Sequence, residues 1–168
     1  KTCIFDPNKE SPAFQNASIV INEGFDNLKA LRKFAKISNA ITYEFENIPI
    51  ESLKLLKNSC KIYPGIKVLK YSQDRYLEKK FINNLGFSVA PFFKINNLKS
   101  IENALDKLNG EGIIKTRRFG YDGIGQYVIS RNQIPKVLKN IEKNSYIIEG
   151  IIKFKKEISV IVIRSKQK

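Results

Sequence analysis

The chain has 168 residues, 42% of them hydrophobic, and carries a formal net charge of +14 at pH 7. This length and apolar content suffice for a buried core in one domain or two small ones, and they argue against disorder. No run approaches the roughly 18 apolar residues of a membrane span and no signal peptide is visible, so we expect a cytoplasmic protein without a membrane partner. Histidine is absent, which excludes a His-based triad and a zinc site, and we expect Cys3 and Cys60 to be core thiols.

The excess of lysine and arginine would attract nucleic acid if the cations were gathered on one face. They are instead scattered through almost every segment and accompany a heavy use of isoleucine and asparagine, which is typical of a genome biased toward A and T. We therefore expect no specific nucleic-acid partner, although a basic nucleic-acid-binding module stays the alternative from a different class. The chain contains no methionine and begins in an apolar run, so we interpret it as a piece of a longer protein.

The first third of the sequence alternates between strand and helix patterns. Strands are predicted over residues 2–7, 17–21, 39–45 and 60–64, and helices over residues 26–36 and 49–59. Asp26 is the predicted cap of the first helix, with Leu28, Leu31 and Phe34 on its apolar side, and Pro49 lies near the start of the second. This alternation predicts a parallel sheet with crossover helices.

A third helix is predicted over residues 72–85, with Ser72 as its cap and Gly86 as its stop, and we place a domain boundary near residue 70. Beyond it, strands are predicted over residues 90–95, 112–116, 126–130, 145–151 and 157–164, and helices over residues 100–108 and 132–140. Strands interleaved with helices in this order describe a small α+β layer. The predicted fold class is therefore an α/β region followed by an α+β region.

The stretch "KTRRFGYDGIGQYVIS" (residues 115–130) supports two interpretations. Asp122 followed by Gly123 between two apolar runs is a strong signal for a β-hairpin. Three glycines in seven residues are more than a tight turn needs, and their exposed N–H groups suit a mobile loop over phosphate, with Lys115 supplying a charge. The spacing matches neither the P-loop nor the dinucleotide-binding glycine pattern, so the residues alone leave both interpretations open.

Four blocks of the sequence carry a family resemblance. They are "TYEFENIP", "YPGIKVLKYSQDRYLEKKFINNLGFSVAPF", "KTRRFGYDGIGQYVI" and "IIEGIIKFKKEISVIV". In this order they resemble the 5-(carboxyamino)imidazole ribonucleotide synthetases, which belong to the ATP-grasp superfamily. The resemblance implies part of a Rossmann-like pre-ATP-grasp domain over residues 1–70 and the first part of an ATP-grasp domain over residues 71–168. Another ATP-grasp carboxylase or ligase is the alternative, but we would not expect it to carry "TYEFEN" beside "GYDG-x-GQ".

The resemblance also implies an activity. Enzymes of this family are ATP-dependent carbon–nitrogen ligases of de novo purine biosynthesis, leading to IMP. They use bicarbonate, through carboxyphosphate, to carboxylate the exocyclic amine of aminoimidazole ribonucleotide. We expect a homodimer for the full-length enzyme and magnesium ligands in a C-terminal part that lies outside these residues. Without those ligands the charge on the transferring phosphoryl group is not neutralised, so we expect the piece alone to be inactive.

Individual charged residues acquire roles from the same resemblance. It places Arg75 near the nucleotide phosphates, makes Lys115 the strand lysine that holds them, and makes Glu157 the carboxylate that receives the ribose hydroxyls. Without the resemblance, we would interpret Arg75 as a surface charge paired with Glu78. Lys115 would be an exposed strand lysine, and Glu157 would be a solvated charge. The apolar run before Lys115 favours partial burial, where an unpaired ammonium is costly.

The remaining implied nucleotide contacts lie in a loop and a hinge. The loop over the phosphates comprises Gly120, Tyr121, Asp122, Gly123, Ile124, Gly125 and Gln126, and the hinge around adenine comprises Glu149, Gly150, Ile151 and Ile152. Tyr121 and Asp122 are also expected to face bicarbonate or the ribonucleotide, whereas the hinge segment on its own reads as a buried strand end. The sequence departs from the family at Phe119, where a small residue is usual, and at Ile124, where a basic residue is common, which bears on loop mobility and phosphate affinity.

Overall fold

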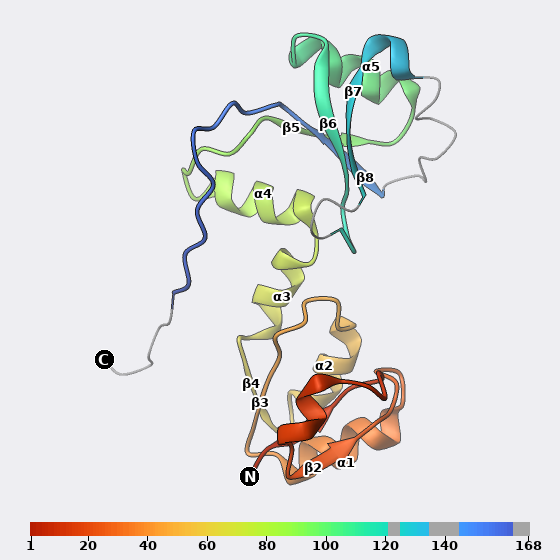
Figure 1. Cartoon of the computed structure of the whole chain (residues 1–168), viewed down its shortest axis with the longest axis vertical. Helices are drawn as coiled ribbons and strands as arrows, with labels where there is room; N and C mark the ends of the chain where they lie inside the picture. Colours follow the sequence, from red (N-terminus) through yellow and green to blue (C-terminus); the bar gives the residue numbers. More distant parts are fainter. Residues whose placement is uncertain (121–124, 135–144, 163–168) are drawn as a thin grey trace.

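The computed structural model describes residues 1–120, 125–134 and 145–162, which form two groups of elements joined through a helical junction (Figure 1). The first group contains β1 (Cys3–Phe5), a 3-10 turn η1 (Pro12–Asn16), β2 (Ile19–Ile21), α1 (Leu28–Ile37), β3 (Ala40–Thr42), α2 (Ile50–Leu56) and β4 (Lys61–Tyr63). The junction is made by α3 (Ile66–Ser72) and α4 (Arg75–Asn84). The second group contains β5 (Phe92–Ile95), α5 (Leu98–Lys107), β6 (Glu111–Thr116), β7 (Gln126–Ser130), a 3-10 turn η2 (Arg131–Gln133) and β8 (Tyr146–Glu149). Each helix in these ranges is too short or too polar to cross a membrane.

The four predicted strands of the first group are confirmed, and they pair in parallel, β1 with β2 and β3 with β4. The expectation of one continuous sheet is wrong, because among the described strands these pairs form two separate two-stranded sheets. A cavity of about 740 Å³, lined by Phe5 of β1, Ile41 of β3 and Leu53 of α2 among others, lies between them. Strands share hydrogen bonds only where they approach to about 4.8 Å, and β1 and β3 form no such ladder.

Helices α1 and α2 cover the β3–β4 pair through Leu31, Ala35, Leu53 and Leu56, all of which are buried. Cys60 is buried in the same cluster and its thiol donates to the carbonyl of Ser38, as expected for a core thiol. Cys3, by contrast, is only partly buried.

The predicted cap of α1 is wrong by one residue. The cap is Asn27 rather than Asp26. The amide oxygen of Asn27 accepts a hydrogen bond from the N–H of Ala30 at 3.1 Å, so the helix begins at Leu28. Leu28 is therefore in the first turn and is exposed, whereas Leu31 and Phe34 face the core as predicted.

The single helix predicted over residues 72–85 is two helices in the structure. Ser72 ends α3, and the cap of α4 is Asp74, whose Oδ1 accepts from the backbone N–H groups of Tyr76 and Leu77. The predicted stop is confirmed, because Gly86 follows the helix at φ +87°, a conformation that glycine adopts without strain. The sequence did not predict α3, in which only Leu69 is buried and the periodic apolar pattern is correspondingly weak.

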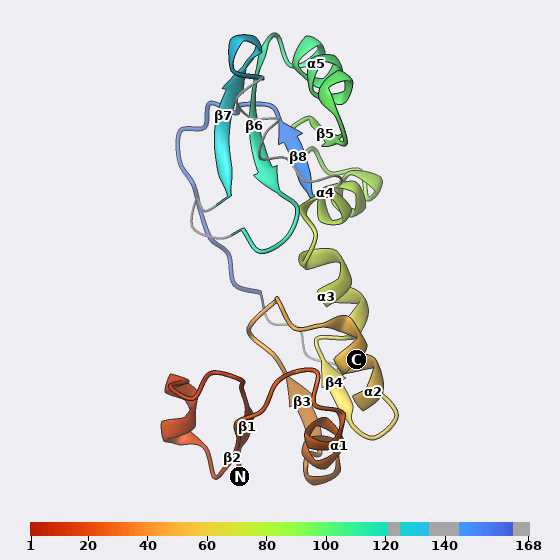
Figure 2. The same ribbon diagram turned by 90° about the vertical axis from the view of Figure 1, so that its right-hand side faces the viewer.

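The second group is an antiparallel sheet in the order β5-β8-β6-β7 (Figure 2). The strands alternate their side chains, so the sheet has two faces. One face packs on α5 and contains the buried residues Ile95, Ile114, Ile129 and Ile148. The opposite face carries Phe92, whose ring meets Tyr76 of α4, together with Lys115 and Glu149. The two polar residues are therefore on the side of the sheet that α4 approaches.

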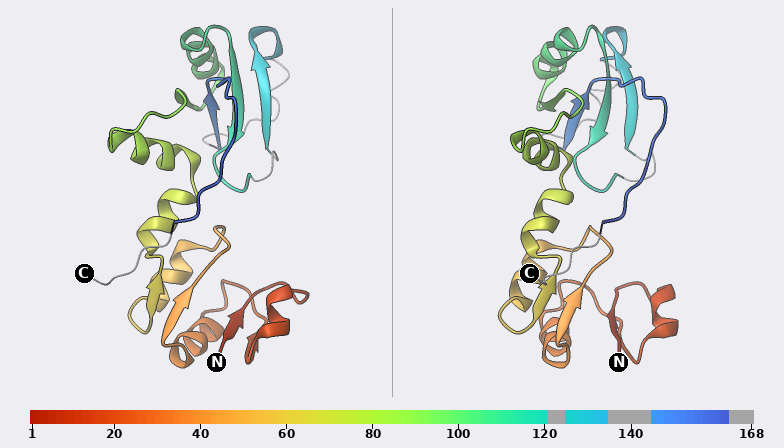
Figure 3. Two further views of the ribbon diagram at one scale, coloured as in Figure 1. Left: turned by 60° about the vertical axis from the view of Figure 1, so that its left-hand side comes forward. Right: turned by 90° about the vertical axis from the view of Figure 1, so that its left-hand side faces the viewer.

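Most predicted elements of this second group are confirmed, and one is wrong. The predicted strand over residues 157–164 is absent from its described part, because residues 157–162 have no partner strand and leave Ile158, Val160, Ile161 and Val162 exposed. Segment 151–162 instead runs from the sheet toward the first group (Figure 3). The predicted helix over residues 132–140 lies largely outside the described residues, which show only η2 and the helical Ile134 at its start.

The close packing of β6 on β8 gives a stability prediction. A Cβ added at Gly112 would lie 2.9 Å from Ile148 Cδ1 and 3.1 Å from the carbonyl oxygen of Glu149, so we expect Gly112→Ala to destabilise the fold by about 1–3 kcal/mol. The matched control is Gly65→Ala, because no atom lies within 4 Å of a Cβ built there, and its effect should stay within about 0.5 kcal/mol. Urea unfolding of both variants measures the difference, and equal stabilities would contradict the packing argument.

Candidate functional site

Lys115 and Glu149 form an ion pair across the face of the sheet that α4 approaches. Lys115 comes from β6 and Glu149 from the neighbouring β8, and Lys115 Nζ lies 2.9 Å from Glu149 Oε2. The carboxylate side chain is only 5% exposed and that of Lys115 is 21% exposed. The sequence reasoning expected both residues at the nucleotide but did not predict that they pair. The structure brings them together.

A second cation reaches the same carboxylate from α4. Lys79 Nζ lies 3.3 Å from Glu149 Oε2, so one carboxylate oxygen serves two ammonium groups. The other oxygen, Oε1, is buried and has no hydrogen-bond partner among the described residues. A buried acceptor without a partner is costly, and such atoms are common where a ligand or an ordered water binds.

The cluster of Lys79, Lys115 and Glu149 has a net positive charge and a free acceptor. Each ammonium has three N–H donors, so it can bind an anion while keeping its contact with the carboxylate. Glu149 Oε1 can accept a hydrogen bond from an amino group of a ligand. The cluster therefore suits a ligand that carries both an anionic group and an N–H donor.

The expected adenine hinge follows directly from this cluster. Gly150, next to Glu149, donates its N–H to the carbonyl of Pro91 at 2.9 Å, which fixes the chain direction after β8. Ile151 and Ile152 follow in the chain and are exposed, so they offer apolar surface. Glu157 is also exposed and lies in segment 151–162, which leaves the sheet.

The glycine stretch leaves the sheet beside Lys115, and the β6–β7 ladder ends where Thr116 donates its N–H to the carbonyl of Gly125. Gln126 begins β7, opposite Lys115, and Gly125 has φ +73°. Gly120 lies outside the ladder. Tyr121, Asp122, Gly123 and Ile124 lie outside the described residues, and so does the predicted Asp122–Gly123 turn.

Arg75 holds this connection at Gly120. Its guanidinium donates from Nη2 to the carbonyl of Gly120 at 2.7 Å, and among the described residues it forms no ion pair with Glu78. The interpretation of Arg75 as a surface charge paired with Glu78 is therefore wrong. Its contact directs it toward the glycine stretch, and its expected position near the nucleotide phosphates stays a prediction.

Arg75 lines a cavity of about 260 Å³ between the two groups of elements, together with Glu46, Glu78 and Gly120. Burial raises the pKa of the Glu78 carboxyl above its ordinary value of 4.5, and the charge of Glu46 raises it further, while Arg75 and Lys79 oppose the shift. The cavity therefore contains a carboxyl that is protonated more readily than an exposed glutamate.

The sequence reasoning missed Lys79, Glu46 and Glu78. Lys79 lies four residues after Arg75 in a predicted helix, so the two cations share a face of α4, and this spacing was a usable signal. Glu46 had no such signal, since only the fold brings residues 44–48 to the start of α4. The described residues contain no group of three or more His, Cys, Asp or Glu that could hold a metal ion.

Two domain families match the chain in succession. The ribonucleotide synthetase preATP-grasp domain matches residues 1–73, and the ATP-grasp domain matches residues 80–168. The second match covers the sheet with Lys115 and Glu149 and begins within α4, next to Lys79.

Individual relatives agree with these matches. The chain is 39% identical over 166 residues to the N5-carboxyaminoimidazole ribonucleotide synthase of Bacillus subtilis, covering 98% of this chain and 44% of the relative. It is 37% identical over 169 residues to the synthase of Brucella melitensis, covering 99% and 47%. The solved structure of N5-carboxyaminoimidazole synthetase from Staphylococcus aureus complexed with ADP superposes with a TM-score of 0.86 at 33% identity, covering 92% of this chain and 42% of that one. The chain thus spans less than half the length of the relatives it matches.

The shifted carboxyl of Glu78 predicts a pH-dependent stability. Because its pKa is raised in the folded state, the folded protein loses stability as pH rises from about 4.5 through the folded-state pKa. Glutamine does not ionise, so Glu78→Gln should raise the thermal midpoint at about pH 7 and leave it nearly unchanged at about pH 3.5, where Glu78 is protonated in both states. The control is Glu102→Gln on the exposed side of α5, and a gain at pH 7 no larger than in this control would contradict the assignment.

Proposed function

The chain belongs to the ATP-grasp family, and from this membership we propose that the protein of which it forms a part is an ATP-dependent N5-carboxyaminoimidazole ribonucleotide synthetase. The enzyme would join bicarbonate to the amine of aminoimidazole ribonucleotide in purine biosynthesis. The observation that carries the proposal is the similarity of almost the whole chain to synthases of this name, at up to 39% identity, together with the preATP-grasp match over residues 1–73.

The cluster of Lys79, Lys115 and Glu149 fits a nucleotide in charge and in hydrogen bonding. We assign the two ammonium groups to the phosphate chain, where charge-assisted contacts are strong. The free Oε1 of Glu149 accepts from the amino group of the base, which removes its burial cost. Ile151 and Ile152 cover the base with apolar surface, and Glu157, on the following segment, takes the ribose hydroxyls.

The phosphoryl group that ATP supplies activates bicarbonate for attack by the amine, and the chain's own residues bind and orient the participants. Arg75 and the loop Gly120–Gln126 enclose the phosphates, and Tyr121 and Asp122 contact bicarbonate or the ribonucleotide. The described residues contain no group of carboxylates that could hold magnesium, and its ligands would come from the C-terminal part of the full-length protein. We also propose a domain boundary near residue 70 and a homodimer for the full-length protein.

The test is an assay of the full-length gene product for ATP hydrolysis in the presence of bicarbonate and aminoimidazole ribonucleotide. We expect ADP formation to depend on the ribonucleotide. Hydrolysis that needs a different amine would instead identify another ATP-grasp ligase, and tight sequence-selective binding to DNA at physiological salt would favour a nucleic-acid-binding module.

The first prediction from this proposal concerns Lys115. Lys115→Ala in the full-length protein should remove a charge-assisted contact to phosphate and weaken ATP binding by about 1.5–3 kcal/mol, which is roughly tenfold or more. The matched control is Lys61→Ala, since Lys61 is an exposed lysine on the remote strand β4. Calorimetric titration with ATP measures both variants, and equal affinities would refute the role of Lys115.

The second prediction concerns the loop Gly120–Gln126. If this loop closes over phosphate, its backbone orders only when the ligand supplies compensating bonds, so its amides should gain protection on nucleotide binding. Hydrogen exchange of the full-length protein with and without magnesium and ATP measures this change. Equal protection in both states would favour a plain hairpin connection.

A further inference from the structure

Three consecutive residues at the junction of the two groups bind the start of the glycine stretch. Gln73 and Asp74 lie between α3 and α4 and Arg75 begins α4. They contact Arg118, Arg117 and Gly120 respectively. We call these six residues the junction clamp. Its residues Arg117, Arg118 and Gly120 follow Lys115 and Thr116 closely in the chain, so the clamp sets the direction in which the stretch leaves the sheet.

The central contact of the clamp is between Asp74 and Arg117. Arg117 donates from Nε to Asp74 Oδ1 at 3.2 Å and from Nη2 to Asp74 Oδ2, a two-point contact that fixes the plane of the guanidinium. The Asp74 side chain is buried, at 8% exposure, and the Arg117 side chain is partly buried, at 16%. Two backbone bonds support the contact, since Arg75 donates its N–H to the carbonyl of Arg117 and Arg117 donates its own to the carbonyl of Ser145.

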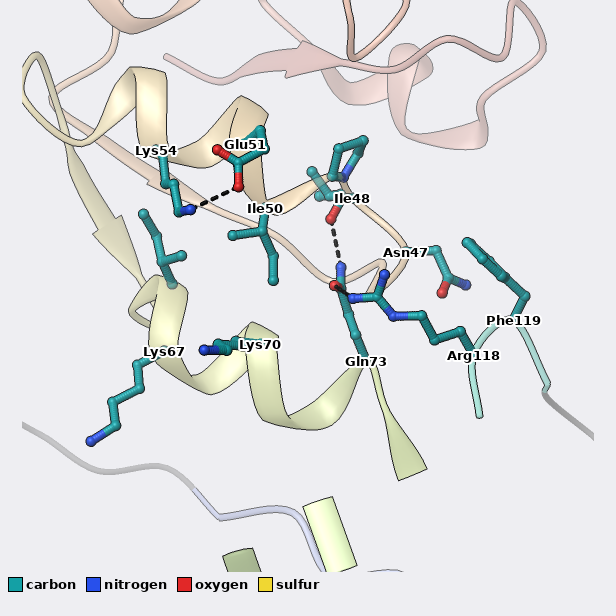
Figure 4. Close-up of a pocket in the computed structure, with 12 residues that line it drawn as sticks. Asn47, Ile48, Ile50, Glu51, Lys54, Lys67, Lys70, Gln73, Arg118 and Phe119 are labelled. Atoms are coloured by element: carbon teal, nitrogen blue, oxygen red, sulfur yellow. Dashed lines mark hydrogen bonds and ion pairs between the residues drawn. The ribbon is translucent and has the colours of Figure 1, made fainter. Parts of the chain in front are cut away.

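Gln73 joins the clamp to the first group of elements. Its Nε2 donates to the carbonyls of Glu46 at 2.6 Å and Ile48 at 2.5 Å, while its Oε1 accepts from Arg118 at 2.9 Å. In Figure 4 the amide of Gln73 lies between Ile48 on one side and the guanidinium of Arg118 on the other. Every hydrogen-bonding atom of this buried amide side chain is thus used to hold two loops from different parts of the sequence.

We propose that Asp74 is a positioning residue for the nucleotide site. Through Arg117 it holds residues 117–120, so that Arg75 and Lys115 approach one phosphate chain from fixed directions. The inference rests on the proposed function, because it assumes that this site binds a nucleotide. It adds a residue that contacts no ligand itself and acts only through the chain that it holds.

Geometry separates this role from the capping role of the same residue. Asp74 Oδ1 also accepts from the N–H groups of Tyr76 and Leu77 and so caps α4. Asparagine is an equally good cap but carries no charge for Arg117. Asp74→Asn therefore preserves the start of α4 and weakens only the clamp.

The experiment measures ADP binding and ATP kinetics of the full-length protein with Asp74→Asn. We expect the Kd for ADP and the KM for ATP to rise by about tenfold, with a smaller change in kcat, and hydrogen exchange across residues 117–120 to become faster. The matched control is Asp106→Asn, which removes the same charge from the exposed ion pair with Arg131. This control should leave the Kd for ADP, the KM for ATP and the exchange across residues 117–120 unchanged. Unchanged Kd and exchange in a folded Asp74→Asn protein would overturn the inference.

A double-mutant cycle decides whether Asp74 acts through Arg117. Arg117→Gln should raise the Kd for ADP to a similar extent. The Kd of the double variant should not exceed the Kd of the single variant that binds ADP more weakly. Additive losses would show that Asp74 does not act through this pair. If Asp74→Asn does not fold, Arg117→Gln carries the same test from the other side of the contact.

The outcomes also separate this inference from the proposed function. If the unaltered protein binds neither ADP nor ATP, the proposed function is wrong. Exchange across residues 117–120 still reports on the clamp in that case, because the contacts exist without a ligand. If the unaltered protein binds nucleotide and Asp74→Asn binds it equally well, only the positioning role is wrong.

Discussion

The buried carboxylate of Glu149 is the constraint around which the second half of the structure is arranged. A carboxylate at 5% exposure is costly unless cations meet it, and Lys115 and Lys79 do so through one oxygen. Because the two lysines come from β6 and α4, the pairing holds the helix against one face of the sheet. The shared carboxylate also allows two ammonium groups to lie close together, where they would otherwise repel each other.

This constraint also explains why the cluster is suited to a ligand. One negative and two positive charges leave a net positive charge, and Glu149 Oε1 is left without a partner among the described residues. A ligand that brings phosphate and an amino group would complete both. Binding would therefore use charges that folding has already oriented, which lowers the cost of ordering side chains on association.

The sequence predicted those parts of the structure that depend on neighbouring residues. The strands around Lys115 and the stop at Gly86 follow from local patterns, and the family resemblance brought Lys115 and Glu149 into one site. The break between α3 and α4 was not predicted. Ser72 and Asp74 are both good helix caps, and only the burial of Asp74 against Arg117 distinguishes them. The strand predicted over residues 157–164 is absent from its described part, residues 157–162, because an apolar alternating pattern forms a strand only where a partner strand receives its backbone.

Phe119 shows how the clamp and the glycine stretch depend on each other. Its φ of +61° is in the left-handed region, which a bulky side chain adopts at a cost of roughly 1–3 kcal/mol, and its ring is exposed, so packing does not offset that cost. The residues on either side are held, Arg118 by Gln73 and Gly120 by Arg75. The clamp contacts thus impose the backbone conformation that a small residue would adopt freely. The strain at Phe119 is a consequence of holding the stretch at both neighbours, and it lies between the two points at which the clamp holds the chain.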